Sequence, residues 1–484
     1  MSTTNLAQLL LQRSSDRPDL RVGTVDHQIL LSDAVRIAAA GAQELQELGI
    51  RRDQRLAIVA NNSTEYMLVW MACLLSGTPV ALVNPTYPPE LLAQMLERLD
   101  PAALFTDLDT LPATMRTFPL STAREWAPVD PQSSPGLDAA PSDLASFMHT
   151  SGTTGLPKFC AQTHEYFLRL GSAMAEALDL QAGDRMLAPL PLFHINPMGY
   201  GIIGALCAGA DALTVRKFSA SGFWPAVREH GVTALALHAP PVEILKRATT
   251  TADSGEHSVR TMFYADREFM SRFGIPVAVS GYGSTEAAGV SHLHRWSLTD
   301  ESEIPSNASR FGGQTRADVE DRLDDDGQIY VRESAPNTLF AGYFRVGAVD
   351  PSRDEDGWFA TGDLGRRDDQ GGLVFLERAA ESIRVKGEFV PIPYVEERLG
   401  TIDALTDLAL WKKPGELVDD DVVLYVVADS VPLESIRDAV ADLPVFMRPA
   451  HIARVATIPR DAAAGKVQRR LLHEQQVLSW TAMS

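Results

Sequence analysis

A loop rich in glycine and hydroxyl side chains carries the strongest chemical signal in the sequence. Residues 150–158 read Thr-Ser-Gly-Thr-Thr-Gly-Leu-Pro-Lys, and an apolar stretch at 144–148 that is typical of a strand precedes them. Glycines allow tight turns whose N–H groups point inward, while the hydroxyl groups and the lysine add further donors. Such a loop can hold phosphate oxygens, although its spacing differs from that of the GxxxxGKS/T loop. A polar connection between two elements would use the same residue types, but nine residues in this order are more specific.

The remaining chain must position this loop, and its elements follow a recognisable order. Helical patterns at 32–48, 64–75 and 90–99 alternate with strand patterns at 55–59, 79–83 and 103–106, which predicts parallel sheets covered by helices. Short strands with Asp-Gly turns follow residue 318, at 328–332, 358–361 and 373–376, and indicate a meander or barrel. Beyond 382 come strands at 408–411 and 422–427 and helices at 393–399 and 433–442, so a domain boundary is expected near 378–382.

Composition excludes several classes of protein. The 484 residues carry a net charge of −20, and an acidic surface repels nucleic acid. Three scattered cysteines predict neither a disulfide framework nor a zinc site, which favours a reducing, cytoplasmic location. The apolar stretch at 67–91 is interrupted by Gly77, Pro79 and Pro85, so we expect a buried helix and strand rather than a membrane span.

Further motifs accompany the phosphate loop along the chain. They are N-P-T-Y at 84–87, P-L-F-H at 191–194, Y-G-S-T-E at 282–286, T-G-D at 361–363, E-R-A-A at 377–380, I-R-V-K-G at 383–387 and G-K-V-Q-R at 465–469. In this order they resemble the motifs of the acyl-adenylate-forming enzymes: acyl-CoA synthetases, peptide-synthetase adenylation domains and firefly luciferase. The resemblance covers residues 50–472 and is nearest to the acyl-CoA ligases.

The resemblance implies a fold and a division into domains. It implies an α/β protein whose large N-terminal region has two sheet-and-helix lobes and a β-barrel section, with a small mobile C-terminal α+β lid. Residues 1–378 would form the AMP-binding domain, 379–381 the hinge with Ala380 at its centre, and 382–484 the lid.

The reaction implied is the activation of a carboxylic acid by ATP and Mg²⁺, giving acyl-AMP and pyrophosphate. By resemblance the nucleotide site comprises Thr150, Ser151, Gly152, Thr153, Thr154, Gly155, Lys158, Asp266, Tyr282, Gly283, Thr285, Asp363 and Arg378. Glu286 and Thr154 would hold the metal, and Lys466, His194 and Thr154 would be catalytic. Lys466 lies among small residues, so its ammonium can bridge two anions as they approach.

Several of these residues have a purely structural alternative. Tyr282 offers a face to adenine or packs in the core, and Asp266 would accept from the adenine amino group. Asp363 would bind the ribose hydroxyls or end a turn, while Glu286 would bind Mg²⁺ or cap a helix. His194 would lie beside the reacting carboxylate or in the core.

The acyl pocket implied by the resemblance consists of Phe193, Met198, Tyr200, Gly201, Tyr264 and Gly289. The glycines of the 198–204 segment leave room for a bulky hydrophobic acid, or they belong to a tightly packed helix. Amino-acid-activating relatives place an aspartate after the P-L-F-H region, where this chain has Ile195, Asn196 and Pro197. We therefore expect an acid without an α-amine.

Two departures from the family pattern concern the step after adenylation. Ala380 replaces the usual hinge Asp or Lys, and Tyr394 follows shifted prolines, although Gly387 is retained where the thiol tunnel is expected. We predict that the chain adenylates well but transfers the acyl group to CoA poorly, so that a partner protein completes the thioester. The alternatives are a complete acyl-CoA synthetase and a non-catalytic acyl- or nucleotide-binding relative, against which Glu286 and Lys466 argue. Nothing in the sequence singles out a luciferase-like oxygenase.

Overall fold

The computed structural model describes residues 3–109, 115–150, 156–264, 266–299, 310–378, 383–385, 388–414, 420–460 and 467–483. No helix within these ranges is long and apolar enough to cross a membrane.

The first lobe is built on an eight-stranded sheet in the order β19-β18-β8-β7-β4-β3-β5-β6. Its strands are β3 (Leu56–Val59), β4 (Val80–Val83), β5 (Ala103–Thr106), β6 (Thr117–Pro119), β7 (Leu144–Thr150), β8 (Lys158–Thr163), β18 (Gly342–Arg345) and β19 (Ala348–Asp350). The strands from β7 to β6 run parallel, and β8 returns antiparallel to β7. Helices α2 (Leu31–Glu47), α3 (Thr64–Ser76) and α4 (Pro89–Leu99) belong to this lobe, as the alternation of patterns predicted.

Local capping explains why α3 begins and ends where it does. The Ser63 side chain accepts from the backbone N–H of Tyr66, and Gly77 ends the helix in the left-handed region at φ 75°. All residues of α3 are buried, which accounts for an apolar stretch without amphipathic character.

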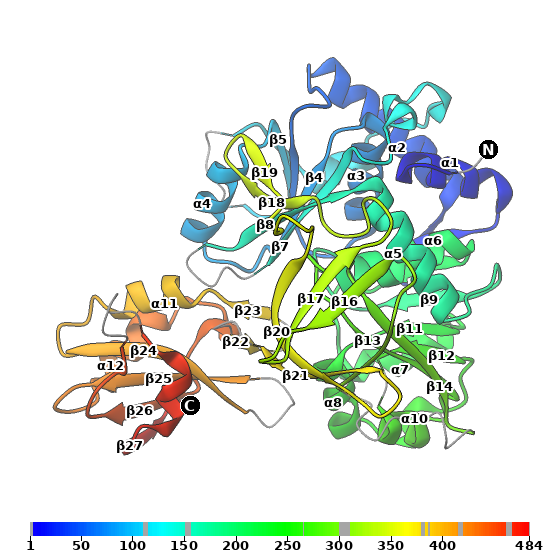
Figure 1. Ribbon diagram of the computed structural model, residues 1–484. Coiled ribbons are helices and arrows are strands. Elements are labelled where there is room, and N and C mark those ends of the chain that lie inside the picture. Colours follow the sequence, from blue (N-terminus) through cyan, green and yellow to red (C-terminus); the bar gives the residue numbers. More distant parts are fainter. Residues whose placement is uncertain are drawn as a thin grey trace.

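The second lobe contains a thirteen-stranded sheet in the order β16-β17-β20-β21-β15-β14-β13-β12-β11-β9-β10-β1-β2. Its parallel part is β1 (Arg21–Thr24), β9 (Arg185–Ala188), β10 (Asp211–Thr214), β11 (Ala234–Ala236), β12 (Thr261–Phe263) and β13 (Val277–Tyr282), with β2 (His27–Leu30) antiparallel at the edge. Its antiparallel part is β14 (His292–Ser297), β15 (Phe311–Thr315), β16 (Val319–Leu323), β17 (Gln328–Glu333), β20 (Phe359–Arg367) and β21 (Leu373–Arg378). The expected barrel section is thus an antiparallel extension of this sheet (Figure 1).

A π-helix and further α-helices complete the N-terminal region. They are α1 (Leu6–Asp16), α5 (His164–Ala177), the π-helix η4 (Asn196–Ile203), α6 (Gly204–Ala208), α7 (Ala220–Glu229), α8 (Ala239–Ala248), α9 (Thr251–Ser254) and α10 (Arg267–Phe273). The π-helix begins directly after the P-L-F-H motif, and π-turns are frequent at functional sites.

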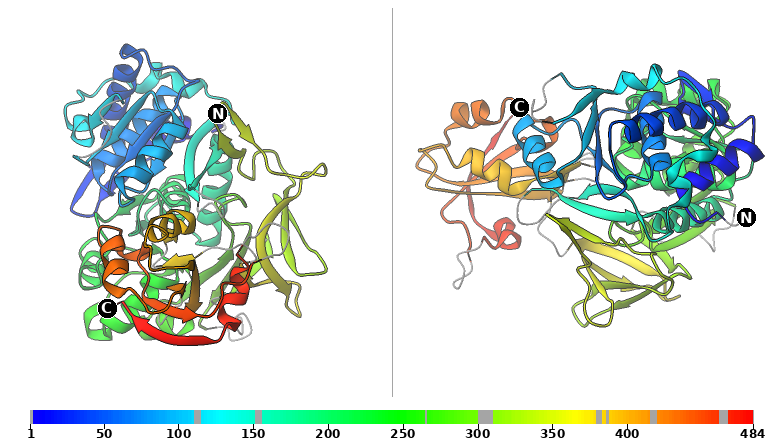
Figure 2. Two further views of the ribbon diagram at one scale, coloured as in Figure 1. Left: turned by 90° about the vertical axis from the view of Figure 1, so that its left-hand side faces the viewer. Right: turned by 90° about the horizontal axis from the view of Figure 1, so that it is seen from above.

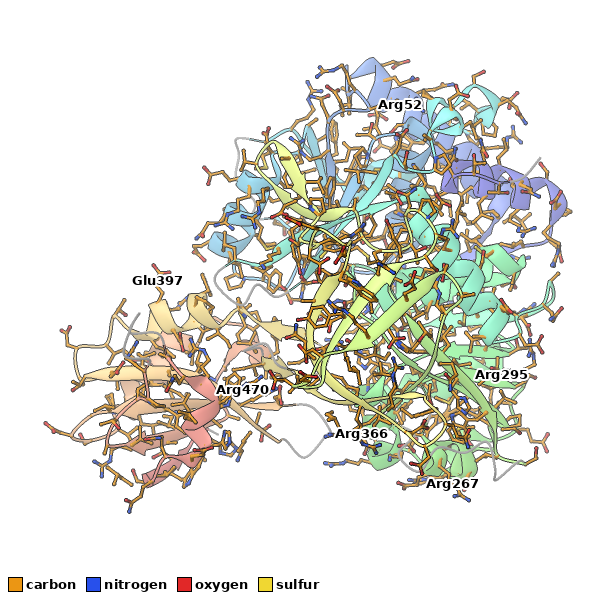
Figure 3. All side chains as sticks on the ribbon, in the orientation of Figure 1. Arg52, Arg267, Arg295, Arg366, Glu397 and Arg470 are labelled. Carbon is orange, nitrogen blue, oxygen red and sulfur yellow. The ribbon has the colours of Figure 1, made fainter. Side chains whose placement is uncertain are left out.

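The C-terminal elements form a smaller body. It contains the hairpin β22 (Ile383–Val385) and β23 (Glu388–Val390), helices α11 (Ile392–Leu399) and α12 (Leu433–Val440), and a sheet of β24 (Asp407–Pro414), β25 (Asp420–Val427), β26 (His451–Val455) and β27 (Val477–Ala482). Figures 1 and 2 show this body to one side of the large region, joined to it near β21 and β22. Glu397 and Arg470 mark its surface in Figure 3.

The hairpin and its neighbours contact the first lobe. Tyr87 of the N-P-T-Y motif meets Phe446 with ring centroids 6.3 Å apart. Ile383 and Val390 are buried in the same apolar cluster as Phe147 of β7. The hairpin therefore lies on the side of the C-terminal body that contacts the first lobe, where its polar residues can reach the N-terminal region.

Candidate active site

A cavity of about 310 Å³ brings most of the sequence motifs together. Its walls come from β7 and β8 of the first lobe, the π-helix and β13 of the second lobe, and the C-terminal hairpin. The residues that line it are Met148, His149, Thr150, Lys158, Leu190, Phe193, His194, Ile195, Asn196, Pro197, Tyr200, His238, Phe263, Tyr264, Gly281, Gly283, Ser284, Thr285, Glu286, Val290, Tyr343, Thr361, Asp363 and Arg384.

The ends of the phosphate loop open onto this cavity. Thr150 is the last residue of β7 and Lys158 the first of β8, and the two are paired across the antiparallel strands. The Lys158 ammonium lies 4.6 Å from the centroid of the Tyr343 ring, a cation–π contact. Residues 151–155, including the expected ligands Ser151, Gly152, Thr153, Thr154 and Gly155, lie outside the described residues.

Glu286 contacts the end of β7 and does not cap a helix. Its Oε1 accepts hydrogen bonds from Thr150 Oγ1 at 3.1 Å and from Tyr343 Oη at 3.0 Å. Burial raises the pKa of Tyr343, so the phenol stays protonated and donates.

The chemistry of this carboxylate fits magnesium. A hard cation prefers carboxylate oxygens and is usually held by one or two of them together with nucleotide phosphates. Within the described ranges, no three His, Cys, Asp or Glu side chains gather to hold a metal by themselves. The site thus offers one acidic ligand, Glu286, next to the strand end where phosphates would lie.

Asp363 is held in place by Tyr282. Asp363 is 5% exposed, and its Oδ2 accepts from the Tyr282 hydroxyl at 2.8 Å. The Tyr282 ring packs against Phe375 at a centroid distance of 5.9 Å and an angle of 22°. Asp363 lines the cavity and Tyr282 does not. The Tyr282 hydroxyl therefore holds the aspartate while its ring packs on Phe375, and Gly283 and Thr285 of the same motif line the cavity.

Asp266, expected beside adenine, is engaged elsewhere. Its carboxylate caps α10 by accepting from the Phe269 N–H at 2.7 Å, and it forms an ion pair with Lys246 at 3.2 Å. Asp266 does not line the cavity, whereas Tyr264, two residues earlier, does.

The expected acyl pocket divides into two groups. Phe193, Tyr200 and Tyr264 line the cavity, whereas Met198, Gly201 and Gly289 do not. Met198 is fully buried in the core. A Cβ on Gly201 would lie 2.4 Å from Ala188 Cβ, and one on Gly289 would lie 2.5 Å from Leu170 Cδ2. These glycines permit close packing of the elements. For Gly201 this is the second of the two explanations that the sequence left open.

Sequence reasoning missed a carboxylate from the C-terminal hairpin. Glu388 Oε1 lies 3.0 Å from His194 Nε2, and Glu388 Oε2 accepts from Asn84 Nδ2 at 2.9 Å. Burial opposes ionisation of Glu388, but the adjacent His194 and the other basic groups around it together outweigh burial and lower the pKa of the carboxyl. The signal in the sequence is only that Glu388 follows Gly387 directly.

His149 completes this polar cluster. The Asn84 N–H donates to His149 Nε2 at 3.2 Å, which places the ring proton on Nδ1, 3.4 Å from Tyr87 Oη. Burial lowers the pKa of His149 to about 3, so the imidazole is neutral.

Four expected residues cannot be placed in this cavity by their side chains. Lys466, Gly387 and Ala380 lie outside the described residues, and only the backbone of Arg378 is described. That backbone is paired with Asp363 across β20 and β21.

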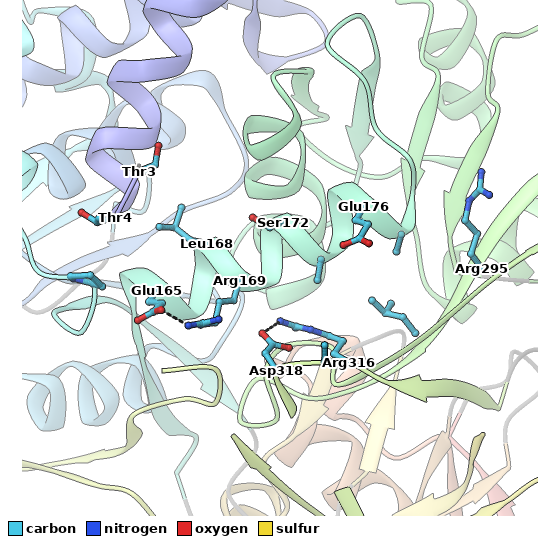
Figure 4. Close-up of a pocket in the computed structure, with 15 residues that line it drawn as sticks. Thr3, Thr4, Glu165, Leu168, Arg169, Ser172, Glu176, Arg295, Arg316 and Asp318 are labelled. Atoms are coloured by element: carbon cyan, nitrogen blue, oxygen red, sulfur yellow. Dashed lines mark hydrogen bonds and ion pairs between the residues drawn. The ribbon is translucent and has the colours of Figure 1, made fainter. Parts of the chain in front are cut away.

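A larger cavity of about 750 Å³ lies along α5 and is lined there by Glu165, Arg169 and Glu176 (Figure 4). Two of its arginines are paired, Arg169 with Glu165 at 2.5 Å and Arg316 with Asp318 at 2.7 Å. None of the motif residues lines it, so the smaller cavity is the candidate active site.

Known proteins resemble this chain over nearly its whole length. The 4-coumarate–CoA ligase 3 of Arabidopsis thaliana is 27% identical over 95% of this chain and 89% of its own. The long-chain-fatty-acid–CoA ligase FadD13 of Mycobacterium tuberculosis is 23% identical over 97% and 98% of the two chains.

Solved structures show the same fold. A double mutant of o-succinylbenzoate CoA synthetase from Bacillus subtilis, bound to a product analogue, superposes with a TM-score of 0.82 at 22% identity and covers 97% of this chain and 98% of its own. The same synthetase with its acyl-adenylate gives 0.68 at 22% identity over 98% and 99%. The family model of the AMP-binding enzymes matches residues 17–344, which are about two thirds of the sequence. The chain therefore belongs to the AMP-binding enzyme family.

Proposed function

We propose that this chain is an AMP-forming acid–CoA ligase that carries out both half-reactions in the cavity between its two bodies. In the first, a carboxylate oxygen attacks the α-phosphorus of ATP, the bond from that phosphorus to the bridging oxygen breaks, and pyrophosphate leaves. In the second, the thiolate sulfur of CoA attacks the acyl carbon, the bond to the AMP oxygen breaks, and AMP leaves.

The observation that carries the proposal is that residues of several motifs line one cavity. Thr150, Lys158 and Glu286 are among them, with Glu286 hydrogen-bonded to Thr150, and this group would meet the phosphates and magnesium. Asp363 also lines the cavity and can accept from both ribose hydroxyls. We propose that His194 and Tyr200 mark the acyl end, so that the acid would lie between them and the α-phosphorus.

The chain's own residues supply charge and position. Magnesium, when bound, would neutralise charge on the phosphates as the leaving group forms. Glu286 would hold it, with Thr154 as the second ligand we propose. The Lys158 ammonium adds positive charge at the same end, and Lys466 is proposed to bring the two anions together.

The hairpin supports a second half-reaction here. Glu388 binds both Asn84 and His194, and Arg384 reaches into the cavity, so the C-terminal body is anchored at the acyl end rather than remote from it. The whole chain also superposes better on the Bacillus subtilis synthetase bound to a product analogue, with a TM-score of 0.82, than on the same synthetase bound to its acyl-adenylate, with a TM-score of 0.68. Gly387 precedes Glu388 and would lie along the path of the thiol.

One feature of the sequence favours a different outcome. Ala380 cannot make the polar contact of a hinge aspartate or lysine, and a bias of about 1.4 kcal/mol between two positions of the C-terminal body reduces the minor one tenfold. The second candidate is therefore an enzyme that stops at acyl-AMP and passes it to a partner.

The two candidates are separated by one set of measurements on the full chain. Acid-dependent ATP–pyrophosphate exchange, run without CoA over aliphatic, aryl and terpenoid acids, identifies a substrate. Quenched-flow analysis with that acid and CoA then follows acyl-AMP and acyl-CoA separately. Acyl-CoA that forms as fast as acyl-AMP disappears supports the complete ligase. Acyl-AMP that accumulates while acyl-CoA stays absent supports the second candidate, and no exchange with any acid refutes both.

A further inference from the structure

Two polar atoms at the acyl end of the cavity have no hydrogen-bond partner within the described part of the chain. They are Asn196 Oδ1 and His238 Nδ1, both buried, and both residues line the cavity. Asn196 Nδ2 donates to the Leu237 carbonyl at 2.9 Å, which fixes the orientation of the amide. The atom left over is therefore the amide oxygen, an acceptor.

The two atoms belong to neighbouring parts of the cavity wall. Asn196 is the first residue of the π-helix, and its hydrogen bond to residue 237 brings it next to His238, which precedes α8. Burial and the nearby Arg384 and His194 keep the pKa of His238 far below its ordinary value. Its imidazole is neutral, so Nδ1 can donate or accept according to the tautomer.

Buried polar groups in folded proteins are nearly always paired, so two orphans in one cavity indicate a partner that the ligand supplies. That partner must donate to Asn196 Oδ1. A second carboxylate cannot donate, and an ammonium group would lie beside the Arg384 guanidinium. A hydroxyl group satisfies both atoms, because its O–H donates to the amide oxygen while its oxygen accepts from His238 Nδ1–H.

We infer that the acid activated by this chain carries, besides its reacting carboxylate, a hydroxyl group that is bound by Asn196 and His238. The inference rests on the proposed function. The body of the acid would pass between Tyr200, Phe263 and Tyr264, which present apolar surface, while its carboxylate lies toward His194. The ribose hydroxyls of ATP are the other groups that could pair with these atoms, but we propose that Asp363 of β20 accepts their hydrogen bonds.

The test compares acids that differ by one hydroxyl group. The pairs are 4-hydroxybenzoate and benzoate, 4-hydroxyphenylacetate and phenylacetate, 3-(4-hydroxyphenyl)propionate and 3-phenylpropionate, and 6-hydroxyhexanoate and hexanoate. ATP–pyrophosphate exchange is measured without CoA, so that no effect arises from the thiol. We expect kcat/KM for the hydroxylated acid of the best pair to exceed that of its partner by at least about tenfold, because a site built for a hydroxyl rejects the analogue that lacks it.

Two variants assign this preference to the proposed residues. Asn196→Leu and His238→Phe each remove one polar partner at similar size. Each should reduce the preference to about threefold or less, by lowering activity with the hydroxylated acid while activity with the plain acid remains. His473→Phe, at an exposed position of the C-terminal body, should leave the preference unchanged. Melting temperatures show whether each variant folds, and the comparison of acids on the unmodified chain does not depend on them.

The outcomes separate this inference from the proposed function. Exchange that is equal for the two members of every pair, or a preference that survives both variants, overturns the hydroxyl inference and leaves the proposed function standing. A rise in KM for ATP that is the same with all acids assigns the two atoms to the nucleotide and also overturns it. No exchange with any acid refutes the proposed function, and this inference falls with it.

Discussion

Replacing Glu388 by Gln tests whether the contact between the two bodies serves thioester formation. One oxygen of the Glu388 carboxylate accepts a hydrogen bond from Asn84 Nδ2, and the other lies within hydrogen-bond distance of His194 Nε2. In Glu388→Gln one oxygen becomes an NH₂ group that faces another donor, and the negative charge is lost. Glu388 belongs to the C-terminal body, which we propose moves between the two half-reactions. Only the half-reaction that uses the arrangement with these contacts should therefore slow.

The magnitude follows from the value of a hydrogen bond to a charged group, about 1.5–3 kcal/mol. A loss of about 2 kcal/mol in this arrangement corresponds to about a 30-fold reduction in its population. We therefore expect single-turnover conversion of preformed acyl-AMP to acyl-CoA to slow by about 30-fold. Acid-dependent ATP–pyrophosphate exchange should stay within about twofold of the unmodified chain.

A reciprocal substitution provides the sharpest control. Asn84→Asp places two carboxylates face to face and should also slow the thioester step, whereas the double variant Asn84→Asp, Glu388→Gln lets the new amide donate to the new carboxylate. Partial recovery in the double variant would show that the two residues act through each other. Glu397→Gln, an exposed glutamate on α11, should have no effect. A Glu388→Gln enzyme that makes acyl-CoA at the normal rate, or loses exchange to the same extent, would refute this reasoning.

Three further predictions concern the remaining site residues. Glu286→Gln should lower exchange by at least about tenfold and weaken its dependence on Mg²⁺, because a neutral amide is a poor ligand for a hard cation; a fall in melting temperature with an unchanged Mg²⁺ response would instead mark Glu286 as structural. Lys466→Ala should lower single-turnover acyl-AMP formation by about a hundredfold or more with little change in ATP affinity, since its charge acts as two anions approach, and near-normal turnover would remove it from catalysis. The pKa of His149 is about 3 against an ordinary 6.5, so the unfolded chain takes up a proton below pH 6.5 and the folded chain does not. His149 should therefore contribute a fall in stability of about 2 kcal/mol between pH 7 and pH 5, and chemical denaturation should show a smaller fall in His149→Gln; an equal fall would contradict the neutral buried imidazole.

Local patterns along the chain predicted the elements well. The helix expected at 64–75 is α3 (Thr64–Ser76), and the strand expected at 103–106 is β5. Both have unambiguous local signals, a serine cap and a glycine end for the helix and an uninterrupted apolar run for the strand. The strands of the expected meander or barrel section were predicted too, but its attachment to the second sheet was not, because the pairing of β15 with β14 and β21 is a long-range choice.

By itself, the sequence determined the chemistry that the motifs share, because phosphate binding and metal binding depend on residue types in fixed local order. The structure is needed wherever a role depends on what lies opposite a side chain. Gly201 could equally line a pocket or permit packing until Ala188 was placed against it, and Gly289, expected in the acyl pocket, has Leu170 against it.

The same physical reason governs the polar residues. Asp266 was assigned to adenine from its position in the chain, but Lys246, twenty residues away, occupies its carboxylate. Glu388 drew no attention because nothing beside it shows that Asn84 and His194, some 300 and 190 residues earlier, will bind it. A hydrogen bond depends on distance in space, so local order specifies which groups are available, and only the tertiary structure decides which of them meet.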